Sequence, residues 1–177
     1  WTALGRRERL LHLAAGTLFF LHLWTYVYAA QNTLVANAMA AFCTNPLLVG
    51  LGAWLAHDER PTPRLAAGYL LAALGVWALL SGSVSLTGGR LGGDLAALAS
   101  AAFFAGYVLV GRRLRRGLDN RAYACGVYAV TALLFGLTGL ARGVEWVGHP
   151  PSFWAAVGAL GLGVTLGGHA LFTYLLD

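Results

Sequence analysis

Polar side chains are rare in the long stretches of this sequence that contain no Asp, Glu, Lys or Arg, and the few that occur there could bind a solute. Histidine can form hydrogen bonds or carry a proton near neutral pH, and the asparagine amide both donates and accepts. In hydrocarbon, a polar side chain is costly unless it meets a partner or a wet cavity. Five side chains are therefore candidates for substrate binding, with structural bonding between helices as the alternative: His22, Asn37, Asn45, Tyr107 and His169.

The asparagines and Pro46 share the charge-free stretch 10–57. Asn37 and Asn45 are eight residues apart, which places them close to one face of a helix at about 100° per residue. Pro46 has no N–H, so the carbonyl four residues before it, on Phe42, loses its helical partner. The sequence therefore predicts a kink at Pro46 whose carbonyl lines a substrate cavity, or else a kink that serves packing alone.

Glu59 follows this stretch, immediately before Arg60. A carboxylate at the inner end of a membrane span could close a gate by pairing with a neighbouring arginine such as Arg60 or Arg64. A solvated helix end is the alternative. In either case we do not expect Glu59 to carry protons at the membrane midplane.

The composition decides the class of protein in which these residues act. Only 11% of the 177 residues are charged and 58% are hydrophobic, whereas about 25% of a soluble domain is charged. Disorder would need the opposite composition, and two cysteines are too few for a disulfide scaffold. The two cysteines and five histidines lack the spacing of metal ligands. The sequence predicts a polytopic protein of the lipid bilayer without a metal or cofactor.

The apolar stretches are long enough for helices that cross a membrane, which need about 20 residues each. They are continuously apolar and rich in Ala, Leu and Gly, whereas barrel strands would alternate apolar and polar residues. The stretch 10–57 suits two spans separated by the polar residues 30–33. The predicted fold is all-α with six spans, at residues 10–30, 33–56, 64–82, 93–112, 121–141 and 153–176.

The arginines give this arrangement an orientation. All 12 basic residues are Arg; Arg90 and Arg142 fall on one side of the six spans and the other ten on the opposite side. Because cytoplasmic loops attract Lys and Arg, the second side is expected to be cytoplasmic, with both chain ends on it, in the cytoplasmic membrane. The arginines of residues 112–116 are interpreted in the same way, as topology determinants, so nucleic acid is not an expected partner.

The first and last spans share a pattern. In residues 10–30, Gly16 and His22 precede Thr25, and in residues 153–176 a Gly and a His at the same spacing precede Thr173. Two helices five spans apart cross in opposite directions, as in inverted-repeat transporters. The polar, glycine-rich segment 81–94 would then separate two halves, residues 1–84 and 85–177.

Several motifs resemble the EamA-type drug/metabolite transporters. They are Thr33–Ala38, Asn45-Pro46, Glu59-Arg60-Pro61, Gly68, Gly75, Gly93-Asp94-Leu95 and Gly168-His169. The resemblance implies ten helices in two inverted five-helix repeats, of which this chain would be helices three to eight. The chain starts with Trp1 and ends in an apolar stretch, as a fragment would. Thr173 stands where some branches of the family have Asn, which puts the substrate in question.

The resemblance implies a transporter that moves a small organic metabolite or drug by alternating access, as an exporter or exchanger. We do not expect an enzyme. The alternatives are a membrane-embedded enzyme and a scaffold subunit that does not transport. No carboxylate is expected inside the spans, so proton coupling would depend on histidine or on other helices. The oligomeric state is left open.

Overall fold

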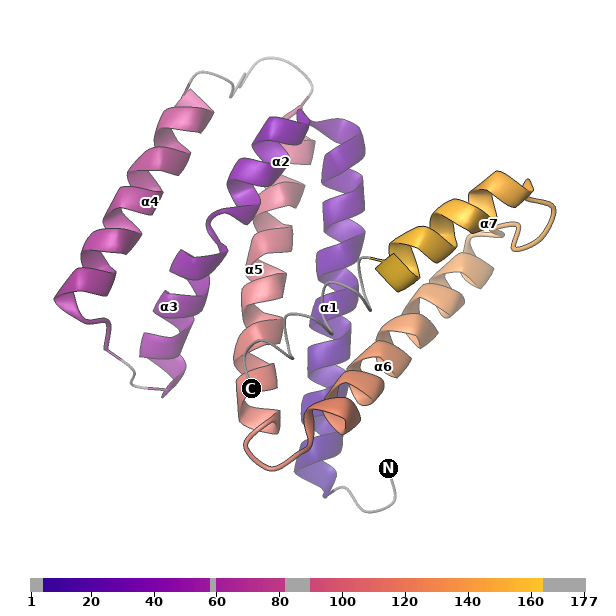
Figure 1. Cartoon of the computed structure of the whole chain (residues 1–177), viewed down its shortest axis with the longest axis horizontal. Coiled ribbons are helices and arrows are strands. Elements are labelled where there is room, and N and C mark those ends of the chain that lie inside the picture. The colour runs from indigo at the N-terminus through magenta and orange to yellow at the C-terminus, as the bar shows by residue number, and fades with distance from the viewer. Residues whose placement is uncertain (1–4, 58–59, 82–89, 164–177) are drawn as a thin grey trace. The chain divides into compact units, whose positions relative to one another are not determined.

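The computed structural model describes residues 5–57, 60–81 and 90–163 (Figure 1). Within these ranges the chain is all-α, as predicted, and no strand occurs. The helices are α1 (Arg6–Asn32), α2 (Val35–Phe42), α3 (Asn45–His57), α4 (Pro63–Ser81), α5 (Leu91–Leu114), α6 (Asn120–Ala141) and α7 (Pro151–Gly158). They fall into two units, residues 1–137 and 138–177, and α6 crosses the boundary between them.

Four helical segments in the described residues are long and apolar enough to cross a membrane: Arg6–Asn32, Val35–Ala56, Leu91–Leu114 and Asn120–Ala141. They coincide with four of the six predicted spans. A shorter apolar helix, Pro63–Ala78, lies where the third span was predicted. The sixth prediction, 153–176, begins with α7 and continues beyond residue 163, outside the described residues. The protein is therefore a polytopic membrane protein.

In the first unit, α1 lies along α5, and α3 packs between α5 and α4 (Figure 1). Glycines make these approaches close. A Cβ on Gly52 of α3 would collide with the Leu109 side chain of α5, and one on Gly50 would collide with the Tyr69 ring of α4. Small residues at helix contacts are typical of membrane bundles, in which backbones approach one another directly.

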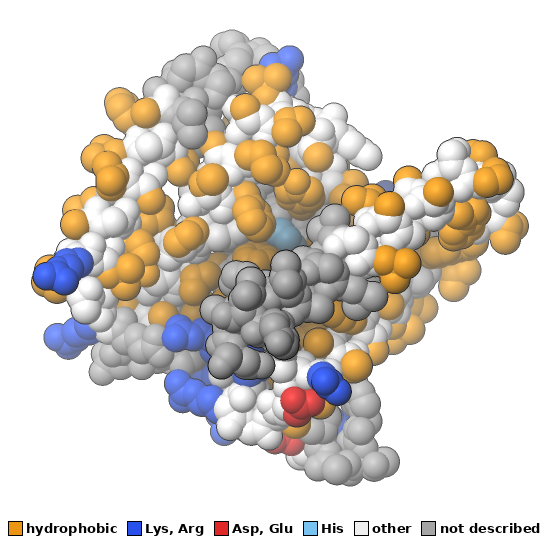
Figure 2. Space-filling model, in the orientation of Figure 1, with side chains coloured by type: hydrophobic (Ala, Val, Ile, Leu, Met, Phe, Trp, Pro, Cys, Tyr) orange, Lys and Arg blue, Asp and Glu red, His pale blue; other side chains and the backbone are white. Residues whose placement is uncertain are grey.

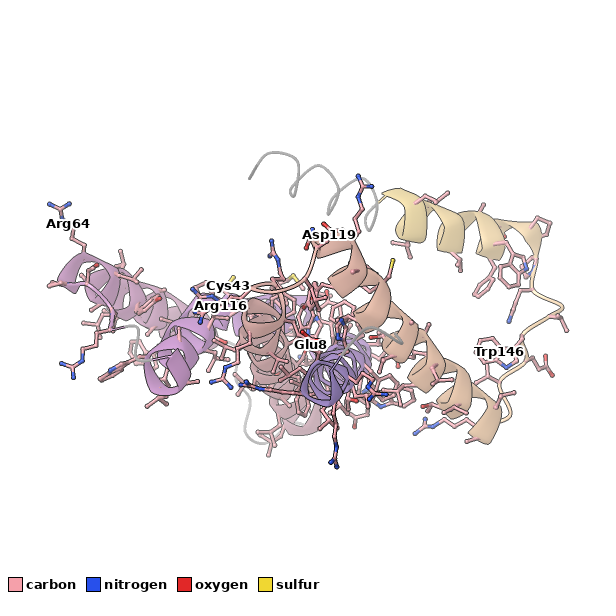
Figure 3. All side chains as sticks on the ribbon, turned by 90° about the horizontal axis from the view of Figure 1, so that it is seen from below. Glu8, Cys43, Arg64, Arg116, Asp119 and Trp146 are labelled. Atoms are coloured by element: carbon pink, nitrogen blue, oxygen red, sulfur yellow. The ribbon has the colours of Figure 1, made fainter. Side chains whose placement is uncertain are left out.

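The outer surface of these helices is apolar (Figure 2). On α4, the side chains of Leu70, Leu71, Leu74 and Trp77 are between 61% and 73% exposed. Such a surface would aggregate in water, whereas lipid covers it at no cost. Basic side chains gather toward the lower part of the view in Figure 2, and Figure 3 shows Arg64 extending away from the start of α4.

The second unit contains the end of α6, a loop and α7. Two glycines of the loop have left-handed backbone, with φ of 65° at Gly143 and 88° at Gly148. The Trp146 ring packs on Gly139, where a Cβ would collide with it. The ring of His149 stacks on that of Phe153 with centroids 4.2 Å apart.

Gly16→Ala is expected to destabilise the first unit. A Cβ at Gly16 of α1 would lie 2.5 Å from the Cβ of Val130 in α6, so the two helices would have to separate. Overpacking of this kind costs about 1–3 kcal/mol. Thermal unfolding of the purified full-length protein in detergent measures the effect. The matched control is Gly136→Ala in α6, where a new Cβ meets nothing within 4 Å; an equal loss in both variants would contradict the prediction.

Candidate functional site

His22 is buried in the middle of α1, with 6% of its surface exposed. Its Nδ1 lies 3.0 Å from the backbone oxygen of Ser100 and 2.9 Å from the Ser100 hydroxyl. The Ser100 hydroxyl in turn donates to the backbone oxygen of His22 at 3.1 Å. Because a carbonyl oxygen can only accept, Nδ1 carries the proton, and Nε2 of the neutral ring remains as an acceptor. Ser100 on α5 thus fixes the tautomer of His22.

Aromatic rings surround His22. We call Phe19, Phe42, Phe104 and Tyr107 the aromatic cluster. The ring centroid of His22 lies 4.9 Å from that of Phe104, 5.9 Å from Phe42 and 6.0 Å from Phe19. Tyr107 joins the cluster through Phe19, at 4.9 Å. The structure therefore brings two of the candidate residues, His22 and Tyr107, to one place lined by rings from α1, α2 and α5.

The predicted kink at Pro46 is a complete break in this structure, since α2 ends at Phe42 and α3 begins at Asn45. Two residues form the turn. The Thr44 backbone N–H and hydroxyl both donate to the oxygen of Ala41, at 3.1 and 2.6 Å. Pro46 cannot donate to Phe42, so the α-helical ladder cannot continue there. The break is next to the aromatic cluster, because Phe42 is the last residue of α2.

Asn45, the first residue of α3, is 7% exposed. Neither polar atom of its side chain has a hydrogen-bond partner in the described part of the chain. A buried polar group without a partner costs about 1–3 kcal/mol. The Asn45 amide is thus a donor and an acceptor that remain available for another molecule or segment, three residues after the Phe42 ring.

Asn37 lies elsewhere, near the start of α2, and is 3% exposed. Its Nδ2 donates to Oδ1 of Asp94 at 3.1 Å, and the Thr33 hydroxyl donates to the same oxygen. Asp94 occupies the first turn of α5, because this helix begins at Leu91. It is the carboxylate at the start of the predicted span 93–112, where the polar segment 81–94 ends.

Two candidates, Glu59 and His169, lie outside the described residues. Near the end of α3, a guanidinium nitrogen of Arg113 donates to the backbone oxygen of Ala56 at 3.0 Å. Arg113 thereby links the last turn of α3 to the end of α5. Among the described residues, no group of three or more His, Cys, Asp or Glu side chains could hold a metal ion.

The first four helices are similar in sequence to a known family of transporters. Residues 4–81 match the EamA-like transporter family. We call these residues the EamA-like segment, after this similarity. The chain is also similar to the uncharacterized transporter YwfM of Bacillus subtilis (strain 168), with 25% identity over 142 residues. That similarity covers 80% of this chain and 47% of YwfM, so the chain spans about half the length of this relative. No solved structure matches the chain significantly.

The EamA-like segment carries His22, Asn37, Asn45 and Pro46, whereas the residues that contact them from α5 follow it. Two of these contact residues, Ser100 and Asp94, were not among the predicted site residues. Asp94 was visible as part of a motif resembling the start of the second EamA repeat. Ser100 stands in a run of alanines and gives no signal of its own.

Proposed function

We propose that the complete protein transports a small organic metabolite or drug across the cytoplasmic membrane by alternating access, as an exporter or exchanger. The match of residues 4–81 to the EamA-like transporters carries this proposal. Residues 1–84 would be the last three helices of the first repeat and residues 85–177 the first three of the second. Both ends of the chain would face the cytoplasm, together with the arginine-rich loops.

The substrate site is proposed at the break between α2 and α3. There the Asn45 amide can donate and accept, and the His22 ring presents Nε2 as an acceptor because Ser100 occupies Nδ1. The rings of the aromatic cluster, Tyr107 included, provide flat apolar walls. The break at Pro46 places the turn between two half-helices beside these groups, as in transporters whose sites are formed by discontinuous helices.

The remaining candidates have roles in this proposal. Asn37 would act through Asp94, to which its amide donates a hydrogen bond. Asp94 lies in the first turn of α5, whereas the arginine-rich loop follows the last turn of this helix. Glu59 would close the inner gate with a neighbouring arginine, at the end where Arg113 already links α3 and α5. His169 remains a candidate for substrate binding and lies outside the described residues.

Reconstitution of the full-length protein tests the function. Proteoliposomes are loaded with a broad panel of metabolites and cationic or neutral drugs, and efflux is followed by mass spectrometry. Saturable efflux of at least one compound, absent from liposomes without protein, is expected. No saturable flux across the panel, in protein that remains monodisperse, would overturn the proposal.

Ser100→Ala tests how the site is positioned. The substitution removes the hydroxyl that lies beside Nδ1 of His22 and donates to its backbone oxygen, so the ring loses part of its fixed orientation. We expect flux to fall about tenfold, as for the loss of one buried hydrogen bond. The control is Thr25→Ala, whose hydroxyl donates within α1, to the backbone oxygens of Leu21 and His22. Unchanged flux in Ser100→Ala would contradict this role.

A further inference from the structure

A carboxylate lies where the ends of three helices meet. Oδ1 of Asp94, in the first turn of α5, accepts hydrogen bonds from Thr33 and Asn37. Thr33 caps the end of α1, and Asn37 lies in the first turn of α2. We call these three residues the Asp94 cluster. Its two donors come from helix ends that are 61 and 57 residues away in sequence.

The helix ends are held in close contact around Asp94. A Cβ on Gly93 would lie 2.5 Å from the carbonyl carbon and oxygen of Asn32 and 2.8 Å from the Thr33 nitrogen. The start of α5 therefore rests directly on the backbone at the end of α1. Four buried alanines from α1, α2 and α5 pack beside this junction: Ala29, Ala38, Ala41 and Ala97. A change in the charge of Asp94 would therefore act where the ends of α1, α2 and α5 pack too closely for one helix to move without the others.

One acceptor in the cluster has no donor. Oδ1 of Asn37 is buried and has no partner among the described residues, although the other half of the same amide is bonded to Asp94. The Thr33 hydroxyl and the Asn37 amide both donate to the carboxylate, and Nδ2 of Asn37 also lies 3.4 Å from the Thr33 hydroxyl oxygen, so neither residue donates to the amide oxygen. A buried acceptor of this kind is costly.

A single proton would complete the cluster. A protonated carboxyl group has one O–H donor and one acceptor oxygen. A carboxamide has the complementary pair, so a small rotation of the Asn37 amide lets its oxygen accept from Asp94 while its Nδ2 still donates. Both groups are then satisfied, and the carboxylate charge is neutralised.

The other titratable groups near the cluster are few. On the facing end of α1, residues 23–33 contain only Tyr26 and Tyr28, and residues 34–42 of α2 contain none. Arg90 is exposed and immediately precedes α5. Ser100, six residues after Asp94 on α5, is the residue that contacts His22. Asp94 is thus the carboxylate through which protons could act on the α1–α5 contact that also orients His22.

We propose that Asp94 is the residue that binds the proton coupled to transport, with Asn37 and Thr33 as its partners. The described arrangement, in which both partners donate, is the proton-free form. Proton uptake gives the Asn37 amide oxygen a donor and replaces charge-assisted hydrogen bonds by neutral ones, which changes how the start of α5 is held against α1 and α2. This inference rests on the proposed transport function, but proton binding can be measured without a substrate.

Infrared spectroscopy measures the proton directly. Difference spectra of the purified full-length protein between two pH values are expected to contain a carboxylic acid C=O band that is lost in Asp94→Asn. Asparagine keeps the shape and an acceptor oxygen for Thr33 and Asn37, but it cannot release a proton. The control is Asp119→Asn, which removes an exposed carboxylate and should leave the band in place. A band that persists in Asp94→Asn would overturn the proposal.

A second measurement needs no variant. N,N′-dicyclohexylcarbodiimide reacts with protonated carboxyl groups in apolar surroundings, and peptide mapping locates the adduct. We expect modification of Asp94 that increases as the pH is lowered, with little at the exposed Asp119 and Glu145. Absence of an adduct on Asp94 at every pH tested would count against proton binding there, whether or not the flux panel finds a substrate.

Flux then tests the coupling, with a compound from the panel as the probe. For each coupled proton, a gradient of one pH unit drives up to about tenfold accumulation in the wild type. Asp94→Asn is expected to lose this accumulation but to retain exchange of labelled for unlabelled compound, which needs no net proton movement. Accumulation driven by a sodium gradient and insensitive to the pH gradient would overturn the proposal, as would intact pH-driven accumulation in Asp94→Asn.

Discussion

Replacing Asn45 with leucine is expected to abolish transport while making the protein more stable. The Asn45 side chain is 7% exposed and both its polar atoms lack partners in the described residues. Leucine has a similar size and buries no polar group, so the folded protein should gain about 1–3 kcal/mol. If the substrate is the partner of the amide, its loss should lower flux at least about tenfold. Thermal unfolding and proteoliposome flux measure the two effects on one preparation.

Asn32→Leu provides the matched control for this experiment. Asn32 is exposed at the end of α1, and its amide donates within the helix to the backbone oxygen of Tyr28, at 2.8 Å. The same substitution there should change neither flux nor unfolding temperature appreciably. Asn45→Leu protein that unfolds at a lower temperature would show that the amide has a structural partner. Unchanged flux in stable Asn45→Leu protein would remove Asn45 from the substrate site.

The helices could be predicted because hydrophobicity alone decides them. The long charge-free stretches within the described residues became helices, since backbone groups in hydrocarbon must bond within their own segment. The break after Phe42 was also visible in the sequence, because Pro46 lacks the N–H that the helix would need. The same break limits the argument that placed Asn37 and Asn45 on one face. A rotation of 100° per residue does not continue through the turn at residues 43–44.

The contacts between helices could not be predicted from spacing. Ser100 contacts His22 across 78 residues, and a serine among alanines has no property that distinguishes it from a packing residue. Asp94 ends the polar segment 81–94 and also falls in the predicted span 93–112, and neither assignment names the residues that its carboxylate contacts. Only the position of Gly93 against the backbone of Asn32 places the carboxylate between two helix ends, and that approach depends on the tertiary structure.

Replacing His22 with phenylalanine is expected to reduce flux about 10- to 100-fold, equivalent to roughly 1.4–2.7 kcal/mol. Phenylalanine preserves the ring volume and the packing against Phe104 and Phe42, whose centroids lie 4.9 and 5.9 Å from that of His22. The substitution removes Nε2, the acceptor proposed to face the substrate, and Nδ1, which is bonded to Ser100. Initial rates of efflux from proteoliposomes measure the effect, and retained aromatic packing predicts that the protein still folds.

His149→Phe is the matched control for this substitution, because it removes an imidazole of the second unit whose Nε2 lies 2.9 Å from the backbone oxygen of Glu145. It should leave flux unchanged. The size of the defect in His22→Phe also separates two roles of the ring. A loss no larger than that of Ser100→Ala would mean that the imidazole acts only by joining α1 to α5. A larger loss, with wild-type thermal stability, supports contact between Nε2 and the substrate, since the phenylalanine variant retains the ring contacts and the Ser100 hydroxyl can still donate to the same backbone oxygen of α1.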